Sequence, residues 1–425
     1  MRAASGVQFA ATVFFAVVPL LVTGCNPRTH SGLPPGPRFL PRSGPKVDAR
    51  LVTANTAFGL KLFEQLRGKQ PKDNVFISPA SVVLALAMTY NGAAGDTQQA
   101  MAKTLELGAM TPADVNAANR ALTDNLGNSD IGATLTIADS LWANKGDEFS
   151  DTFVATNKRF YDAELATLDF HDPRSAQTIN DWTSKKTGGK IPQIVDSEQL
   201  GGWDFVLINA VYFSGQWLHE FDPSKTKDMP FTLLDGSPKQ LPMMTRSGKY
   251  MHLKAEGFEA IRLPYGDQGL AMYVFLPDKN SSLAAFCGAL TAQQWDARLK
   301  QFDEGEGSIT LPRFRIEYAA TLNAALTALG MGIAFDPHRA DFGPLEKQPG
   351  ALWIDEVLHK TVLEVDEKGT RAAAATAVSL TKGAMKAPSA PFNMVVDRPF
   401  LCAICDDQTK AILFVGAIVD PGKMG

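Results

Sequence analysis

The chain has little cysteine and no long run of charge of one sign. Its four cysteines, at positions 25, 287, 402 and 405, are too few for a disulfide-based scaffold in 425 residues. The formal net charge of −4 comes without the clustered basic face that nucleic-acid binding requires. The six histidines do not cluster at metal-ligand spacing, so we predict no metal site and no cofactor.

The common enzymatic motifs are also missing. There is no G-x-S-x-G, no H-E-x-x-H, no P-loop and no G-x-G-x-x-G. Cys402 and Cys405 have the spacing of a redox motif, but they lie in an apolar, strand-like run. A reactive thiolate is stabilised at a helix N-terminus, and residues three apart in a strand point to opposite faces. We therefore predict that these two thiols are buried and structural, and that the chain is not an enzyme.

The apolar run near the N-terminus is too short to span a membrane as a helix. Residues 9–22 are 14 residues long, whereas a spanning helix needs about 20. The run ends in Leu-Val-Thr-Gly directly before Cys25, which resembles the lipobox of bacterial lipoproteins. Residues 1–25 are thus predicted to be a lipoprotein signal peptide, lipidated at Cys25, which would attach the protein to the cell envelope on its periplasmic or outer surface. An ordinary cleaved signal peptide is the alternative.

The next segment has the composition of a tether. Residues 26–48 contain six prolines and three glycines and show no hydrophobic periodicity, so they cannot bury enough surface to fold. No comparable linker interrupts the rest of the chain. We predict one large domain over residues 49–425.

Hydrophobic periodicity predicts a mixed fold within this domain. Apolar residues recur every three or four positions in residues 51–66, which predicts an amphipathic helix, and residues 82–90 are apolar on every side, which predicts a buried one. Further helices are expected near 179–189 and 321–330. Strands are expected in the segments ATLTIADSLWA, FVLINAVYF, LAMYVFL and AILFVGAIV. This pattern favours an α+β protein with large, mainly antiparallel sheets.

A long segment near the C-terminus carries the functional signal. Residues 364–378 read EVDEKGTRAAAATAV and are followed by a run of small and flexible residues up to Pro391. Taken alone, the alanines suggest a short helix, but a loop this long in a compact domain is usually functional or disordered.

This segment resembles the hinge of inhibitory serpins. Other motifs of that family follow in order along nearly the whole domain: NVFISPAS at 74–81, INDWTSKKTGGKIPQIV at 179–195, LINAVYFSGQW at 207–217, PMMT at 242–245, LPY at 263–265, LPRF at 311–314, LGMGIAF at 329–335, ADF at 340–342, DRPF at 397–400 and ILFVG at 412–416. The resemblance implies a serpin fold with three β-sheets, eight to nine helices and an exposed reactive-centre loop.

The resemblance also implies a mechanism. The loop over 369–391 is held out as bait, a serine-type protease attacks one of its bonds, and the N-terminal part of the cut loop enters the largest sheet as a new strand. The protease, still bound as an acyl-enzyme, is deformed. The hinge implied by the family pattern is formed by Glu367, Gly369, Thr370, Ala372, Ala374 and Thr376.

The hinge residues suit this insertion. Alternate residues of a strand point to opposite faces, so one face carries Thr370, Ala372, Ala374 and Thr376, all small and uncharged. Arg371 falls on the other face and can stay in solvent. Gly369 supplies backbone freedom, and no proline interrupts the ladder before Pro388.

Two further groups follow from the resemblance. Ser78, Ser81, Asn209 and His359 correspond to the family's shutter, where polar side chains bridge the central strands. Trp217 corresponds to the tryptophan of the breach, where the loop begins to enter. A satisfied core histidine and an ordinary core aromatic residue are the alternatives for His359 and Trp217.

The cut bond stays open among several candidates. Counting as in the family gives Gly383, and one residue earlier gives Lys382, which would suit a trypsin-like enzyme. Ala384, Met385 and Lys386 remain candidates, the first two for an elastase-like or subtilisin-like protease.

Other partners are argued against or left as alternatives. Residues 111–130, which correspond to the heparin-binding helix of some serpins, contain one base, Arg120, so heparin binding is not expected. We expect a monomer that contacts the membrane only through its lipid anchor. A non-inhibitory serpin-fold binding protein is the main alternative, and a lipoprotein enzyme unrelated to proteases is a remote one.

Overall fold

The computed structural model describes residues 44–127, 133–267, 269–348, 350, 352–370 and 390–423. These residues belong to the compact unit Phe39–Gly425. The predicted signal peptide, the first part of the tether and Cys25 lie outside the described residues. The first helix, α1 (Ala49–Lys69), begins where the tether was expected to end, and the Asp48 side chain caps it by accepting a hydrogen bond from the Arg50 N–H.

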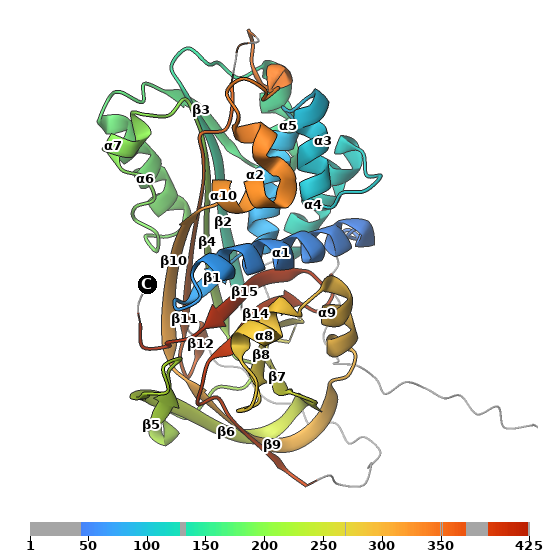
Figure 1. Cartoon of the computed structure of the whole chain (residues 1–425), viewed down its shortest axis with the longest axis vertical. Helices are drawn as coiled ribbons and strands as arrows, with labels where there is room; N and C mark the ends of the chain where they lie inside the picture. Colours follow the sequence, from blue (N-terminus) through green and yellow to red (C-terminus); the bar gives the residue numbers. More distant parts are fainter. Residues whose placement is uncertain are drawn as a thin grey trace, which may run out of the picture. The chain divides into compact units, whose positions relative to one another are not determined.

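A six-stranded sheet extends along the molecule (Figure 1). Its strand order is β10-β11-β4-β2-β3, and the short β12 pairs with one end of β4. The bounds are β10 (Phe314–Thr321), β11 (Glu356–Val365), β4 (Phe205–Gln216), β2 (Ala133–Asn144), β3 (Glu164–Leu168) and β12 (Gly369–Thr370). At its centre β11 and β4 pair in parallel, which places His359 beside Asn209.

A second, nine-stranded network packs against one end of this sheet. Its order is β1-β15-β14-β8-β7-β6-β9-β13, with β5 paired to β6. The bounds are β1 (Val75–Ile77), β15 (Ile412–Ile418), β14 (Phe400–Asp406), β8 (Leu270–Pro277), β7 (Phe258–Tyr265), β6 (Pro238–Ala255), β9 (Asp303–Pro312), β13 (Phe392–Val395) and β5 (Lys227–Thr232). Because β6 pairs with β7 near its end and with β5 and β9 along the rest of its length, it joins two blocks of strands that would otherwise be separate sheets.

Helices cover both faces of the six-stranded sheet. In Figure 1, α1, α2 and their neighbours lie on one side of it and α6 and α7 on the other. The bounds are α2 (Pro79–Tyr90), α3 (Gly95–Thr104), α4 (Pro112–Leu126), α5 (Asp151–Tyr161), α6 (Arg174–Lys186), α7 (Ser197–Leu200), α8 (Leu283–Gly288), α9 (Ala292–Leu299) and α10 (Asn323–Leu326). The mixed fold predicted from the sequence is confirmed. The described ranges contain ten α-helices, one more than expected, because the single turns α7 and α10 are counted.

The most deeply buried helix is α2. All of its residues are buried, as the apolar run predicted, and Ser78 caps its first turn with Pro79 following. The start of α2 contacts the centre of the six-stranded sheet, because the Ser78 N–H donates to His359 of β11.

Cys402 and Cys405 are buried, as predicted, and Cys287 is buried as well. All three thiols are free, and burial raises the pKa of Cys402 to about 12. Such thiols are unreactive, which agrees with a structural role. No described helix is both long and apolar enough to cross a membrane.

Candidate functional site

The hinge begins as a tight turn at the end of β11. Gly369 and Thr370 form β12, which pairs antiparallel with the last residues of β4, Gly369 opposite Gln216 and Thr370 opposite Gly215. Gly369 has φ 130°, and a Cβ there would lie 2.2 Å from the carbonyl oxygen of Gly215. Only glycine fits this close approach, so the loop leaves the body already aligned beside β4.

Trp217 is hydrogen-bonded directly to this turn. Its indole Nε1–H donates to the Asp366 carbonyl at 2.9 Å, and its backbone N–H donates to the Lys368 carbonyl at 3.0 Å. The ring stacks on Tyr265 with 4.4 Å between centroids. These contacts place Trp217 against the turn from which the loop begins, and its role in loop entry stays a prediction.

Glu367 ties the hinge to the nine-stranded network. The buried Glu367 carboxylate accepts a hydrogen bond from the Thr226 hydroxyl at 2.6 Å and pairs with the Arg313 guanidinium. Burial alone would raise the pKa of Glu367, but the bonds from Thr226 and Arg313 outweigh it and hold the pKa below its usual range. The carboxylate thus stays ionised and anchors the turn.

The four predicted shutter residues meet in one buried cluster. The Ser78 backbone N–H donates to His359 Nε2 at 3.2 Å, so the proton of the neutral ring is on Nδ1, which donates to the Asn209 side-chain oxygen. The Asn209 amide in turn donates to the Ser81 hydroxyl. Burial lowers the pKa of His359 to about 3, so the ring is neutral at physiological pH. The cluster joins β11, β4 and the start of α2 across the line along which a new strand would enter.

The cluster has a fifth member, Asp139, which no family motif indicated. This residue lies on β2 opposite Asn209, whose amide donates to the Asp139 carboxylate. Burial raises the pKa of Asp139 to about 7, although hydrogen bonds from Asn209 and Ser81 act in the opposite direction. The only sequence signal was a single acid inside an otherwise uncharged strand.

We expect Asp139→Asn to raise stability at pH 8 and to leave it unchanged near pH 4. The folded-state pKa of Asp139 is raised above its unfolded value, so between about pH 4 and pH 7 the native state binds a proton that the unfolded state has already lost. The stability that this protonated carboxyl contributes at low pH is therefore lost as the pH rises through 7. A pKa shift of three units corresponds to roughly 4 kcal/mol. Because the Asp139 side chain is only part-buried, we expect Asp139→Asn to raise the free energy of unfolding at pH 8 by about 1–2 kcal/mol. Urea unfolding of both proteins from pH 4 to 8 measures this. Equal stability of the two at pH 8 would contradict it.

The face of the six-stranded sheet opposite α2 is partly covered by a helix. The α6 helix and the segment after it cover β4 through Trp182, Ile191 and Ile194, which pack around Ala210 and Tyr212. Because Val362 of β11 belongs to the same cluster, any additional strand between β4 and β11 would lie under α6 on this face. Arg371 was expected to stay in solvent there.

Several predicted residues lie outside the described residues. These are the hinge positions Ala372, Ala374 and Thr376, the bond candidates Lys382, Gly383, Ala384, Met385 and Lys386, and the lipidation site Cys25. Among the residues that sequence analysis did not assign to the site, Arg313 and Thr226 hold Glu367. Arg313 stands in the quoted LPRF motif, but nothing in that motif indicated its partner.

The α4 helix offers little positive charge. Its one base, Arg120, forms an ion pair with Asp124 at 2.8 Å. This is consistent with the prediction that heparin does not bind, which stays a prediction. No group of three or more His, Cys, Asp or Glu side chains that could hold a metal is found among the described residues.

Comparisons with known proteins identify the family to which this chain belongs. The family model described as "Serpin (serine protease inhibitor)" matches residues 53–421. The chain belongs to the serpin family. It is 34% identical to a leukocyte elastase inhibitor from Bos taurus over 385 residues, which covers 88% of this chain and all of the relative.

Other relatives show the range of this family. A corticosteroid-binding globulin from Oryctolagus cuniculus is 33% identical, with 91% of this chain and 99% of the relative covered. The native thermophilic serpin tengpin superimposes with a TM-score of 0.79 at 31% identity, covering 90% of this chain and 97% of that one. Human thyroxine-binding globulin, solved with its ligand, has the same TM-score at 28% identity, covering 88% and 99%. The family thus contains both protease inhibitors and binding proteins.

Proposed function

We propose that this serpin inhibits serine-type endopeptidases by suicide cleavage of its reactive loop, insertion of the cut loop between β4 and β11, and covalent trapping of the protease. The observation that carries the proposal is the position of β12, which starts the loop in register with β4 at the entry point. From there the cut loop can pair with β4 residue by residue without rearranging the turn.

The register of β12 can be extended along the sheet. The pairs Gly369–Gln216 and Thr370–Gly215 would continue to Ala374 opposite Val211 and Thr376 opposite Asn209. On its other side the loop would pair with β11, in the register set by the isolated bridge between Asp366 and Gly369. That register places Ala374 opposite Thr361 and Thr376 opposite His359. The inward positions of the loop would thus meet fully buried neighbours that leave room only for small side chains.

This extension assigns a role to Thr376. An entering strand must break the hydrogen bond between His359 and Asn209, because these residues lie side by side on adjacent strands. In the extended register the Thr376 hydroxyl lies between the two separated groups and can pair with either one. The loop would then replace a bond that its own entry removes.

We expect Thr376→Val to weaken the cleaved form and to leave the uncut form unchanged. Loss of the hydroxyl would leave buried polar groups of the shutter without a partner, at a cost of about 1–3 kcal/mol. Denaturant unfolding of uncut and loop-cut protein measures the difference, with Ser379→Ala, which removes a hydroxyl from the outward face of the same strand, as the control. An equal change in both states, or in both variants, would contradict the assignment.

The energy of insertion is sufficient to act on a bound protease. A dozen residues that add ladder hydrogen bonds at about 0.5–1.5 kcal/mol net each contribute on the order of 10 kcal/mol. The uncut state must then be kinetically trapped, because the more stable state is reached only after the cut.

The experiment that tests inhibition uses a protein that starts at Ala49. It is mixed with trypsin, chymotrypsin, pancreatic elastase and subtilisin, and the products are read by denaturing gel and intact mass. A band at the summed mass supports the proposal, and the mass of the released C-terminal peptide identifies the cut bond. Cleavage within 381–387 by these proteases without such a band would count against inhibition.

The first bonds to examine are those after Lys382 and Gly383. A cut after Lys382 would indicate a trypsin-like target, and a cut after Ala384 or Met385 an elastase-like or subtilisin-like one. The relatives named as elastase inhibitors make elastase a necessary member of the panel.

A non-inhibitory binding protein is the second candidate, favoured by the globulins among the relatives. Against it stand the small, uncharged inward residues of the hinge, which a binding protein does not need. Cleavage of the loop that produces no covalent complex and no gain in stability would favour this candidate.

We also propose that Cys25 is lipidated and holds the protein on the cell envelope. The support is the lipobox-like Leu-Val-Thr-Gly-Cys sequence and the tether-like composition after it. Several acyl chains together suffice for stable anchoring. Labelled palmitate should be incorporated by the full-length chain and lost in Cys25→Ser, and membrane fractions should lose the protein in parallel.

A further inference from the structure

The strand that follows the reactive loop is short and lies at an edge. In the described chain β13 has four residues and pairs in parallel with β9, from Phe392 opposite Gly307 to Val395 opposite Thr310. A four-residue edge ladder on its own is weak. Beyond this ladder, the strand is held by the fully buried Met394 and Val396, and Phe392 adds a contact at the end that faces the loop.

The Phe392 ring makes this contact by reaching across β9 to β6. It stacks on the His252 imidazole with 3.9 Å between centroids and an interplanar angle of 1°, and its edge meets Tyr250 at 5.9 Å. His252 is itself held by a 2.8 Å hydrogen bond to Glu259 on β7. The ring of Phe392 thus links the loop end to two strands beyond its hydrogen-bonded neighbour.

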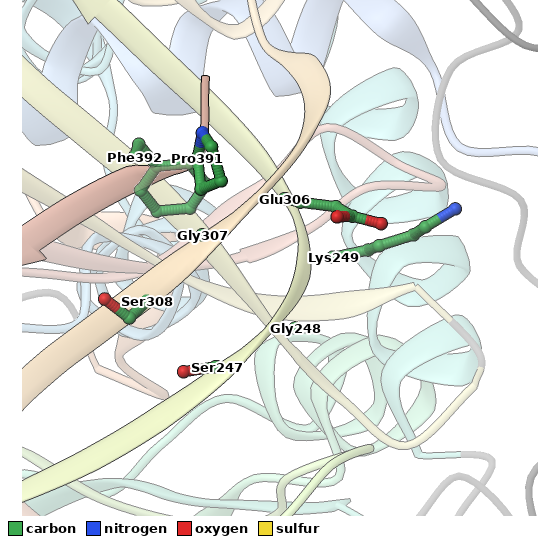
Figure 2. Close-up of a pocket in the computed structure, with 8 residues that line it drawn as sticks. All are labelled: Ser247, Gly248, Lys249, Glu306, Gly307, Ser308, Pro391 and Phe392. Atoms are coloured by element: carbon green, nitrogen blue, oxygen red, sulfur yellow. The ribbon is translucent and has the colours of Figure 1, made fainter. Parts of the chain in front are cut away.

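A glycine on β9 makes room for the ring. A Cβ on Gly307 would lie only 2.4 Å from the Phe392 ring, while one on Gly305 would lie at 3.7 Å. Figure 2 shows Phe392 and Pro391 above the β9 ribbon near Gly307, beside a cavity of about 520 Å³ that Ser247, Gly248, Lys249 and Glu306 also line. Gly307 is therefore the residue that permits the contact.

Chain length shows why this attachment matters. An inserted strand from Thr370 to Leu380 would carry Leu380 about 33 Å along the sheet, at about 3.3 Å per residue. The twelve steps from Leu380 back to Phe392 span at most about 43 Å when fully extended. An uncut loop that enters the sheet as far as Leu380 therefore has at most this length of chain in which to return to Phe392, and we expect deep entry to load β13.

We propose that Phe392 is a positioning residue whose ring, stacked on His252 and seated over Gly307, fastens the C-terminal end of the uncut loop and so keeps the bait exposed. The proposal rests on the proposed inhibitory function. Without the ring, β13 separates from β9 more often, and the uncut loop enters the sheet without trapping a protease.

The test compares Phe392→Ala and Gly307→Ala with the wild type. Both variants should form covalent complex normally when fresh but lose inhibitory activity at 37 °C at least tenfold faster. The inactive product should have the mass of the uncut chain and a raised unfolding temperature. Gly307→Ala keeps the phenylalanine but crowds both its ring and its backbone carbonyl, so a faster loss in both variants shows that the seating of Phe392 on β9 sets the half-life.

A matched control separates positioning from general destabilisation. Asn393→Ala changes the next residue of β13, which contacts Ser308 and not the ring cluster. This variant should lose inhibitory activity with a half-life within about twofold of that of the wild type. Loss of activity into aggregated protein, or an unchanged half-life in Phe392→Ala, would overturn the proposal.

A second readout does not depend on inhibition. The Val396 N–H donates to the Thr310 carbonyl at 2.9 Å, so its hydrogen exchange reports the release of β13 from β9. This exchange should be at least tenfold faster in Phe392→Ala than in Asn393→Ala. If the wild type traps no protease, the proposed inhibitory function fails, but the exchange experiment still tests the anchor. Faster exchange in Phe392→Ala than in Asn393→Ala supports the Phe392 contact, and equal exchange in the two variants overturns it.

Discussion

Ala374→Asp is expected to turn the inhibitor into a substrate. In the extended register, residue 374 lies between Val211 and Thr361, both fully buried. An aspartate there would enter the sheet as an unpaired carboxylate, which costs several kcal/mol. Each 1.4 kcal/mol added to the insertion barrier slows insertion about tenfold, so deacylation would overtake it and the covalent fraction would fall on the order of a hundredfold.

Arg371→Gln is the matched control for this result. Residue 371 belongs to the alternate face, where the extended register places it beside Ser214 and Glu364. Its substitution should leave the covalent fraction within about twofold of wild type. Both variants should still be cut at the same bond, read as the mass of the released peptide. Covalent trapping by Ala374→Asp at the wild-type level would show that the loop does not insert in this register.

His359→Ala is expected to produce the largest loss of native stability among single changes at the shutter. The Ser78 N–H and the Asn209 side-chain oxygen would each lose their partner inside the core, and a cavity would remain beside the start of α2. Buried unsatisfied groups cost about 1–3 kcal/mol each, so the free energy of unfolding should fall by about 2–4 kcal/mol. Denaturant unfolding of the uncut protein measures this.

The control for this prediction is His338→Ala at an exposed position. That change should shift the free energy of unfolding by less than about 0.5 kcal/mol. If the two variants unfold alike, His359 is only a replaceable core residue. The wild type should also show no titration of His359 above pH 5, because its neutral ring has a pKa of about 3.

Local sequence patterns were sufficient to predict the elements around the site. The apolar run over 82–90 predicted a buried helix, and α2 is buried at every residue. Ser78 and Pro79 marked the start of that helix because a hydroxyl cap and a proline at the first position are local signals. The resemblance to the family placed Asn209 and His359 in one group, and the structure brings them into contact.

The partners of these residues could not be predicted in the same way. Asp139 lies 70 residues before Asn209, and Arg313 lies 54 residues before Glu367, so each pair is made only by the arrangement of strands. A charged residue on a strand signals an exposed side chain unless its partner is known. The stacking of Phe392 on His252 depends in the same way on the registers of β6, β9 and β13 together.

The most direct test of loop insertion is the unfolding of the protein after its loop has been cut. The wild-type protein is cleaved within residues 381–387, both fragments are confirmed to remain associated, and thermal unfolding is compared with that of the uncut chain. Insertion between β4 and β11 predicts that the cut protein unfolds at a much higher temperature, because about a dozen ladder hydrogen bonds are added. A cut protein that unfolds at or below the temperature of the uncut chain would contradict the insertion mechanism.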